Sequence, residues 1–252
     1  MFSVVIPYYK KRKFIQRCID AVLAQTYQNF EIILVDDGSN DDVAQLIEER
    51  YLGKVNLIQQ KNQGVSAARN TGIAAATHNF IAFLDADDYW SPFYLAYNAK
   101  IINNETHVKI IGSHYTRKKS KLELKNNNLD YFKFENYFKN AVRNTYFTSS
   151  STIVSNVFFK TNPGFNSNLK RGEDIDVWLR AVASGGNALY INNSLVYYSD
   201  EDVNQATNHK FSIEETLVGI MNENYKNLII ANQRSEFSKF VSKYIYIHLL
   251  TY

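Results

Sequence analysis

The chain has 252 residues, a formal net charge of +3 and 45% hydrophobic residues, which suits one hydrophobic core with at most a small appendage. This composition excludes a disordered chain, and so small a net charge gives no support to a nucleic-acid-binding protein. The single cysteine, Cys18, excludes an intramolecular disulfide and a cysteine-based zinc cluster.

The N-terminal sequence MFSVVIPYYK lacks the basic flank, the long apolar run and the small-residue cleavage site of a signal peptide. No run of about 18 apolar residues occurs, so we expect no membrane-spanning helix. We therefore expect a cytoplasmic protein, with a peripheral contact at the inner face of the cell membrane left open.

Up to residue 104, short β-branched runs alternate with longer segments whose apolar residues recur at helical spacing. The short runs predict buried strands at residues 3–7, 31–35, 55–59 and 80–84. The longer segments predict helices at residues 14–25, 41–51 and 65–76, and a further helix that begins at Ser91-Pro92. This alternation is typical of right-handed crossovers and a largely parallel sheet.

Beyond residue 105 the pattern is less regular. Residues 107–115, 151–159 and 188–198 predict strands, and residues 173–183 predict a helix. Within a basic stretch between the first two of these strands, one broad helical face can be formed by Leu129, Phe132, Tyr137, Phe138, Ala141 and Val142. The tail from about residue 212 is helical by pattern, with one apolar stripe over 213–228 and another over 237–248.

Polar clusters follow each of the first four predicted strands, at the point where the strand ends. They are Pro7-Tyr8-Tyr9, Asp36-Asp37-Gly38-Ser39, the segment 62–70 (NQGVSAARN) and Asp85-Ala86-Asp87-Asp88. Ligands of open parallel sheets bind beyond the carboxyl ends of the strands, where helix N-termini also point. We therefore expect these four loops to meet in one crevice.

The loop after the fourth strand carries three carboxylates in four residues, directly after the apolar run FIAFL. At the edge of a core these charges repel one another, and a divalent cation would remove the repulsion. Hard oxygen ligands suit Mg²⁺ or Mn²⁺ that is shared with phosphates. The alternative is a solvated acidic turn that caps the next helix.

The other loops offer groups that suit a nucleotide. Asp36 and Asp37 can accept hydrogen bonds from a ribose hydroxyl or from a ring N–H of a base. The Gly-Ser pair that follows allows a turn and a helix cap, which is the alternative role of this motif. Arg69 lies in a helix that begins beside Gly64, so its guanidinium can meet phosphate oxygens or form a structural salt bridge with one of the aspartates.

In the second half, Glu173 and Asp174 open a predicted helix, and Trp178 lies one turn further on the same side. Acids at a helix start are also ordinary capping residues, and a tryptophan in this place is also typical of a core. Alone, this segment indicates no more than a well-capped amphipathic helix.

Taken together, residues 3–199 resemble a family 2 glycosyltransferase with the GT-A fold. The resemblance is carried, in matching order and spacing, by the segments VVIPYYK, VDDGSNDD, NQGVSAARNTG, FLDADDYW and GEDIDVW. It implies an α/β fold with a mostly parallel mixed sheet flanked by helices over residues 1–204. Residues 1–104 would be the nucleotide-binding half and residues 105–204 the acceptor half. The helical C-terminal extension, residues 205–252, lies outside the resemblance.

The resemblance also implies a site for a nucleotide-sugar donor, with UDP favoured. The residues expected at that site are Pro7, Tyr8, Asp36, Asp37, Gly64, Arg69, Asp85, Ala86 and Asp87. Asp85 and Asp87 would be the two acids of the DXD motif that hold Mn²⁺ or Mg²⁺. His209 or Asp202 are candidates for a third metal ligand.

Asp174 would be the catalytic base of an inverting transfer, and Glu173 and Trp178 would lie on the acceptor side. A carboxylate opposite the leaving diphosphate can take the proton of an acceptor hydroxyl, while a cation stabilises the charge that leaves. The Gln-x-x-Arg-Trp motif of processive members is absent, so single addition is expected. The implied acceptor is a glycan or lipid-linked saccharide, in assembly of cell-surface polysaccharide, lipopolysaccharide or glycoprotein glycans.

Other protein classes fit less well. A dinucleotide-dependent oxidoreductase would need Gly-x-Gly-x-x-Gly after the first strand and a nucleotide hydrolase would need a Walker loop, and the chain has neither. A sugar nucleotidyltransferase is the nearest enzymatic alternative, but its glycine- and lysine-rich loop for a triphosphate is not seen. An inactive nucleotide-binding scaffold of the same fold is the non-enzymatic alternative, against which the intact acids argue.

Between Lys109 and Arg143 the chain has nine basic residues and three acidic ones. With the aromatic cluster at residues 131–138 and the amphipathic tail, this stretch would allow docking on an anionic membrane leaflet beside a lipid-linked acceptor. A solvated surface loop over a core-packed helix is the alternative. The sequence leaves the oligomeric state open.

Overall fold

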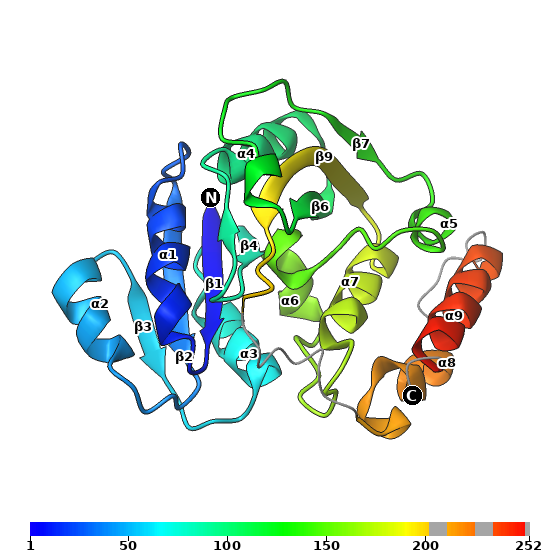
Figure 1. Ribbon diagram of the computed structural model, residues 1–252. Coiled ribbons are helices and arrows are strands. Elements are labelled where there is room, and N and C mark those ends of the chain that lie inside the picture. The colour runs from blue at the N-terminus through cyan, green and yellow to red at the C-terminus, as the bar shows by residue number, and fades with distance from the viewer. Residues whose placement is uncertain (202–210, 225–233, 250–252) are drawn as a thin grey trace.

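The structure, a computed structural model, describes residues 1–201, 211–224 and 234–249 (Figure 1). Its strands are β1 (Phe2–Tyr8), β2 (Phe30–Asp36), β3 (Asn56–Gln59), β4 (Phe80–Phe83), β5 (Tyr89–Trp90), β6 (Val108–Thr116), β7 (Tyr131–Lys133), β8 (Thr152–Ser155) and β9 (Asn187–Tyr197). Its α-helices are α1 (Arg12–Leu23), α2 (Val43–Tyr51), α3 (Val65–Ala75), α4 (Tyr94–Asn104), α5 (Tyr137–Ala141), α6 (Asn156–Thr161), α7 (Glu173–Ala183), α8 (Leu217–Asn224) and α9 (Arg234–Leu249). Short 3-10 turns are η1 (Lys119–Lys121), η2 (Ser149–Ser151) and η4 (Ile213–Glu215).

The described strands form one nine-stranded sheet in the order β3-β2-β1-β4-β8-β6-β9-β5, with β7 paired to β9. The first four strands in the chain are parallel. In their register, Val5 of β1 lies beside Ile33 of β2 and Phe83 of β4. Strand β8 runs antiparallel to β4 and β6, whereas β6 and β9 are parallel. The expected mixed sheet flanked by helices is therefore confirmed.

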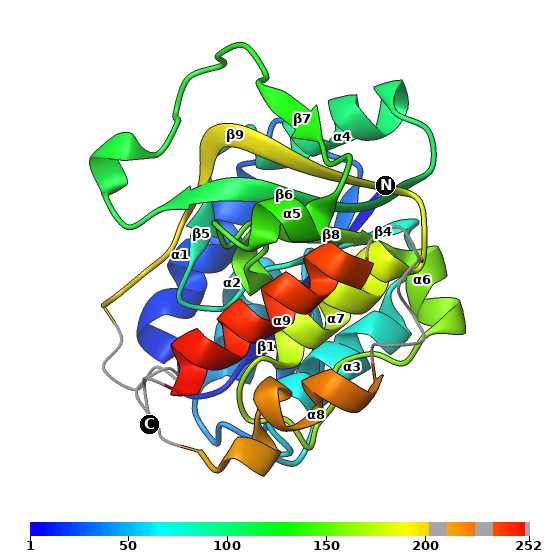
Figure 2. The same ribbon diagram turned by 90° about the vertical axis from the view of Figure 1, so that its right-hand side faces the viewer.

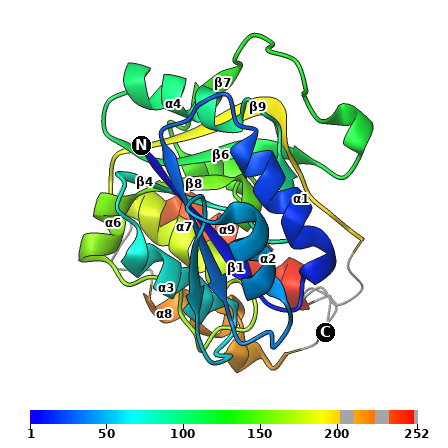
Figure 3. The same ribbon diagram turned by 90° about the vertical axis from the view of Figure 1, so that its left-hand side faces the viewer.

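Successive side chains of a strand point to opposite faces of the sheet. The apolar strands therefore present side chains to both faces, and helices cover each face. Val4 and Ile6 of β1 belong to a core shared with α1, α2 and α4, and Figure 3 shows α1 and α2 in front of the sheet. Val5 points to the other face, which α3, α6 and α7 cover (Figure 2). A Cβ added at Gly72 of α3 would lie 2.3 Å from Val5 Cγ1, so the lack of a side chain allows this close packing.

Several predicted elements need correction. The helix expected from Ser91 begins at Tyr94, because a turn bonded from Tyr94 N to Ser91 O precedes it. The strand expected over 151–159 ends at Ser155, which pairs with the first residue of β4, and α6 follows. In the basic stretch only Tyr137–Ala141 is helical, since Phe132 lies in β7 and pairs with β9. For residues 151–159 and for the basic stretch, pairing with a distant strand overrides the local pattern.

The C-terminal extension is helical where the structure describes it. Parts of its predicted apolar stripes face the body of the protein, with Leu217, Met221, Phe237 and Val241 buried, whereas Ile213 of the first stripe is 40% exposed. Residues 225–233, which include the end of the first stripe, lie outside the described residues. The division into domains at residues 204 and 205 stays a prediction. Among the helices that are described, none has the length and apolar character needed to cross a bilayer.

Candidate active site

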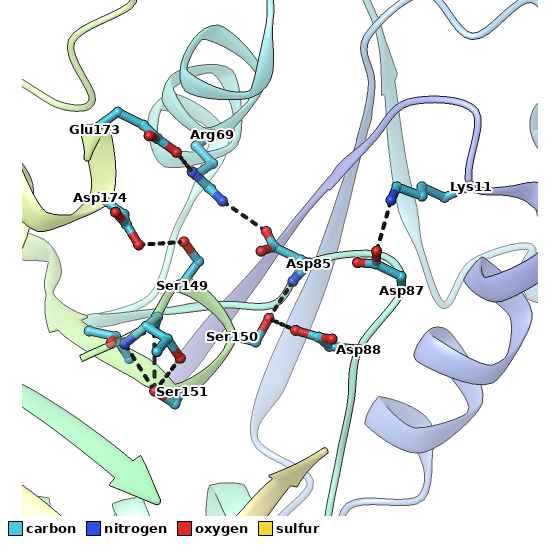
Figure 4. Close-up of polar contacts among 12 residues, drawn as sticks. Lys11, Arg69, Asp85, Asp87, Asp88, Ser149, Ser150, Ser151, Glu173 and Asp174 are labelled. Atoms are coloured by element: carbon cyan, nitrogen blue, oxygen red, sulfur yellow. Dashed lines mark hydrogen bonds and ion pairs between the residues drawn. The ribbon is translucent and has the colours of Figure 1, made fainter. Parts of the chain in front are cut away.

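The acidic loop at residues 85–88 leaves the carboxyl end of β4 and is fastened to η2 (Figure 4). Asp85 N donates to Ser150 Oγ at 3.0 Å, and the same hydroxyl donates to Asp88 Oδ2 at 2.5 Å. Ser199 N donates to the other carboxylate oxygen of Asp88 at 2.7 Å. Burial, and then the charges of Asp85 and Asp87, raise the pKa of Asp88 well above its usual value. Asp88 therefore anchors the loop, while Asp85 and Asp87 keep more of their surface exposed.

A buried arginine joins the acidic loop to the second half of the chain. Arg69 Nη2 donates to Asp85 Oδ1 at 2.8 Å, and Nη1 donates to Glu173 Oε1 at 3.0 Å. The side chain is 3% exposed and lies over the ring of Phe165. Burial disfavours its charge, yet Asp85, Glu173 and Asp174 outweigh burial and raise the pKa of Arg69. Arg69 is therefore a fixed positive charge between two acidic segments. The structural salt bridge that the sequence offered for Arg69, beside a contact with phosphate, is present.

The start of α7 places two further acids on the other side of Arg69. Asp174 accepts hydrogen bonds from Ser149 Oγ at 3.2 Å and from Ile175 N at 2.7 Å. Burial, and then the charge of Asp174, raise the pKa of Glu173 to about 7. Burial also raises the pKa of Asp174, against the opposing charge of Arg69. A carboxylate with a raised pKa is a better proton acceptor near neutral pH.

Basic side chains of α1 hold the far end of the acidic loop. Lys11 Nζ lies 2.8 Å from Asp87 Oδ2, and Arg17 Nη2 donates to the carbonyl of Asp87 at 2.8 Å. Burial, and then Asp85, raise the pKa of Asp87, while Lys11 lowers it. Lys11 and Arg17 were missed by the sequence reasoning, although the basic run KKRK at residues 10–13 was a usable signal for Lys11.

The donor set of this loop fits a divalent cation only in part. Asp85 and Asp87 supply hard carboxylate oxygens, and each of the two ion pairs above occupies a single oxygen of its carboxylate. Within the described residues, no group of three or more His, Cys, Asp or Glu side chains is placed to hold a metal. The third-ligand candidates His209 and Asp202 lie outside the described residues. Two protein carboxylates suit Mg²⁺ or Mn²⁺ that takes its other ligands from water and phosphates.

The two aspartates at the end of β2 are buried and brace neighbouring loops. Asp36 accepts hydrogen bonds from Ser39 N and from Gln59 Nε2. Asp37 accepts from Gly64 N at 2.7 Å, and also from the backbone N–H of residue 63 and the side chain of residue 60. The bond from Ser39 N belongs to the turn that the sequence offered as the alternative to a nucleotide contact, but the expected helix cap is wrong, because α2 begins after Asp42 and has no side-chain cap. Gly64 itself has a φ of 91° and open space where a Cβ would be, so a ligand can approach its backbone.

At the end of β1, the expectation for Tyr8 is corrected. Its side chain is 1% exposed, and its hydroxyl donates at 2.6 Å to Oδ2 of the exposed Asp41. The next residue, Tyr9, is 43% exposed at the carboxyl end of the strand. The period of two along a strand carried this signal, because Tyr8 shares the face of the apolar residues Val4 and Ile6. Pro7 is also buried, beside Val35 of β2.

Two more expected site residues belong to the core. The methyl group of Ala86 is buried in the core that β1 shares with α1, so its side chain does not face a ligand. Trp178 is 1% exposed and packs against Phe83 and Phe165, which leaves no exposed ring for an acceptor. These observations concern the methyl group and the ring alone, so the places of Ala86 at the donor side and of Trp178 at the acceptor side stay predictions.

Serines 149 and 150 connect the two acidic segments. One hydroxyl contacts Asp174 and its neighbour contacts Asp85 and Asp88, so a single turn, η2, touches both sides of the site (Figure 4). The run TSSST at residues 148–152 marks this turn in the sequence. Its role could not be read there, because the hydroxyl partners lie far away along the chain.

Comparison with known proteins gives consistent matches. The model of the family described as Glycosyl transferase family 2 matches residues 3–162. An uncharacterized glycosyltransferase of Nostoc sp. is 47% identical over 96 residues, which cover 37% of this chain and 30% of that protein. An uncharacterized glycosyltransferase of Rickettsia felis is 28% identical over 221 residues, or 87% of this chain and 36% of that protein. The chain thus spans about a third of the length of these relatives.

Two solved structures share the fold. Staphylococcus aureus TarS in complex with UDP-GlcNAc aligns with a TM-score of 0.77 at 22% identity, over 96% of this chain and 72% of that one. The mannosyltransferase PcManGT of Pyrobaculum calidifontis, in complex with GDP-Man and Mn²⁺, aligns with a TM-score of 0.71 at 16% identity, over 98% and 70%. These likenesses confirm the expected GT-A fold. At 22% and 16% identity they show the fold alone.

Proposed function

Because the chain belongs to glycosyl transferase family 2, we propose that it transfers a sugar from a nucleotide-sugar donor to a hydroxyl of a saccharide acceptor. The observation that carries this proposal is the continuous polar network around Arg69 and η2. It gathers Asp85, which suits a cation and a diphosphate, and Asp174, which suits a proton acceptor, around the same guanidinium. Transfer of a sugar needs both functions within one pocket.

The donor nucleotide would lie over the carboxyl ends of the parallel strands. The exposed ring of Tyr9 offers a face for stacking of a base, a role that replaces the one expected for Tyr8. Asp36 and Asp37 would accept hydrogen bonds from the base and ribose in addition to holding their loops. The open space at Gly64 allows the nucleotide to approach the backbone.

Asp85 and Asp87 would hold Mn²⁺ or Mg²⁺ against the donor diphosphate. When bound, such an ion stabilises the negative charge of the departing diphosphate. Lys11 Nζ, which lies 2.8 Å from Asp87, adds a mobile positive charge that can also pair with a phosphate oxygen. Arg69 keeps the Asp85 carboxylate oriented through its hydrogen bond.

Asp174 would act as the general base. The acceptor hydroxyl gives its proton to the Asp174 carboxylate as its oxygen bonds to the anomeric carbon. The bond between that carbon and the diphosphate oxygen breaks, and the diphosphate leaves with the electron pair. Attack from the side opposite the leaving group inverts the anomeric centre. The hydrogen bonds from Ser149 and from the backbone of Ile175 hold the carboxylate in place for this step.

We favour a UDP-sugar as donor, since the structure of TarS contains UDP-GlcNAc, although PcManGT contains GDP-Man. The acceptor would be a glycan or lipid-linked saccharide in cell-surface polysaccharide, lipopolysaccharide or glycoprotein glycan assembly. The identities of the donor and of the acceptor belong to the proposal, because the chain spans only part of the length of its curated relatives.

A peripheral membrane contact would depend on the exposed basic residues 117–119 and 121. The aromatic residues that were expected to join them, Phe134, Tyr137 and Phe138, are buried. Sedimentation with anionic and neutral vesicles tests this contact. Binding to anionic vesicles that weakens with salt would support it, and absence of binding at low salt would dismiss it.

Nucleotide release from a panel of UDP- and GDP-sugars in the presence of Mn²⁺ tests the proposed activity. We expect release with at least one donor, its loss on addition of EDTA, and its loss in Asp174→Asn. Asp130→Asn, at an exposed aspartate beside β9, is the matched control and should keep the wild-type rate. Formation of a nucleoside triphosphate from added pyrophosphate would indicate a nucleotidyltransferase instead. Binding of UDP with no release from any donor, with or without saccharide acceptors, would indicate an inactive scaffold.

A further inference from the structure

The start of α7, which carries Asp174, has no side-chain cap of its own. Gly172 occupies the cap position with a φ of 80°, and no side chain there bonds to the first N–H groups of the helix. Of the first N–H groups, that of Ile175 bonds to the Asp174 carboxylate, and a first turn without a capping side chain at its cap position loses order more easily. A general base needs a fixed position, because displacement by about 1 Å can lower a rate about 100-fold. Ser149 Oγ and Ile175 N hold the Asp174 carboxylate, so contacts from elsewhere are needed to fix the backbone at residues 170–172, from which α7 starts.

The chain just after η4 supplies the first of these contacts. Lys170 N donates to Glu215 O at 2.7 Å, and Leu217 N donates to Arg171 O at 3.0 Å. Arg171 and Thr216 form a parallel β-bridge between these two hydrogen bonds. The backbone directly before the cap position of α7 is thus paired to the C-terminal part of the chain, which is distant in sequence.

Side chains of α8 and α9 close on the cap position itself. A Cβ built at Gly172 would lie 2.8 Å from Leu217 Cβ and 2.9 Å from the Tyr244 hydroxyl oxygen. Both distances are shorter than ordinary carbon contacts, so only glycine fits between the two side chains. Leu217 comes from α8 and Tyr244 from α9, which Figure 2 shows beside α7.

These contacting segments are themselves anchored to the body of the protein. Phe237 and Phe240 of α9 pack against Phe138 of α5 with ring centres 5.1 and 6.0 Å apart. A capping box joins Ser212 and Glu215 and stabilises the turn that leads into α8. The contacts at Gly172 therefore come from an ordered support.

We propose that residues 212–224 and 234–249 form a brace that positions Asp174 for proton transfer, with Leu217 and Tyr244 as its positioning residues. The proposal rests on the proposed function, which assigns Asp174 the role of base. The contacts that define the brace are made to residues 170–172 and not to the donor-side acids Asp85 and Asp87. Loosening the brace should therefore slow the chemical step and leave donor binding intact.

Two pairs of variants test the brace in the full-length chain. Leu217→Ala is compared with Ile213→Ala, and Tyr244→Ala with Tyr246→Ala, because Ile213 and Tyr246 belong to the same segments but are 40% and 64% exposed. We expect Leu217→Ala and Tyr244→Ala to lower kcat roughly 10- to 100-fold, with the donor KM and the UDP Kd within about twofold of wild type. Both control variants should keep the wild-type kcat, and the conservative Leu217→Met should recover most of it.

Hydrogen exchange gives a second readout that does not depend on activity. Backbone amides at residues 170–176 should exchange roughly tenfold faster in Leu217→Ala, and those at 85–88 should not change. Folded variants with unchanged kcat and unchanged exchange would overturn the brace, as would a parallel loss of UDP affinity and kcat. If Leu217→Ala does not fold, Tyr244→Ala decides by the same criteria. If the wild-type chain had no transferase activity, the proposed function would be refuted. The exchange experiment would still test whether Leu217 holds residues 170–176.

Discussion

Replacing Arg69 with methionine removes the charge that joins the two acidic segments while keeping a side chain of similar length. Two ion pairs are lost, to Asp85 at 2.8 Å and to Glu173 at 3.0 Å. Removing one partner of a buried ion pair typically costs about 3–5 kcal/mol, because the remaining charges stay desolvated. Since the Asp85 side chain is 30% exposed and can be hydrated, we expect the lower end, about 3 kcal/mol.

The cost should depend on pH, with a sign that follows from the carboxyl pKa values. Burial raises the pKa of Glu173 to about 7, and Arg69 opposes that rise. Without Arg69 the pKa values of Glu173 and Asp174 rise further above those of an unfolded chain, about 4. The folded state then binds these protons more tightly than the unfolded state, so stability falls as pH increases from about 5 to 8. The deficit of Arg69→Met relative to wild type should be largest at pH 8.

Denaturant unfolding at several pH values between about 5 and 8 measures this deficit. Arg12→Met is the matched control, because Arg12 pairs with Asp42 at 2.6 Å but both side chains are exposed, 39% and 54%. An exposed pair contributes at most about 1 kcal/mol. A deficit for Arg69→Met as small as that of the control, or one that is equal at pH 5 and pH 8, would refute the reasoning.

Three further predictions concern the acids. Asp174→Asn should lower kcat by at least about 100-fold while UDP affinity stays within a few-fold, and equally weakened UDP binding by calorimetry would remove its role as base. Asp87→Ala should lose the Mn²⁺-dependent part of UDP binding, so unchanged calorimetric binding would exclude it as a metal ligand. For the wild type, kcat/KM should rise with pH along an acid limb that lies above the ordinary range of an aspartate, because burial raises the pKa of Asp174. A limb at the pKa of an ordinary aspartate, about 4, would show that the buried Asp174 does not titrate as the base.

Local sequence patterns were sufficient for most of the elements and for the location of the site. Short β-branched runs predicted β1 to β4, and helical spacing predicted α7 with the same bounds, residues 173–183, that the structure has. Polar residues at the ends of parallel strands predicted the acidic loop, since topology brings such ends to one edge. These features depend on neighbours within a few residues, so the sequence contains them directly.

The same local rules were wrong where a distant partner decides the outcome. Residues 151–159 have the composition of one strand, but β8 can extend only as far as its partner β4, and α6 begins there. The resemblance placed Tyr8 at the ligand, whereas the sheet directs its ring into the core and leaves Tyr9 exposed.

Tertiary structure alone decided how the site is held together. Arg69 and Glu173 are 104 residues apart, and nothing near either residue specifies the other. The two serines of η2 and the brace at Gly172 are also contacts between segments far apart in the chain. The sequence by itself therefore determined which chemical groups are available and at which strand ends they lie. Their pairing and orientation depend on the packing of the whole chain, because a buried charge is stable only where the fold supplies its partner.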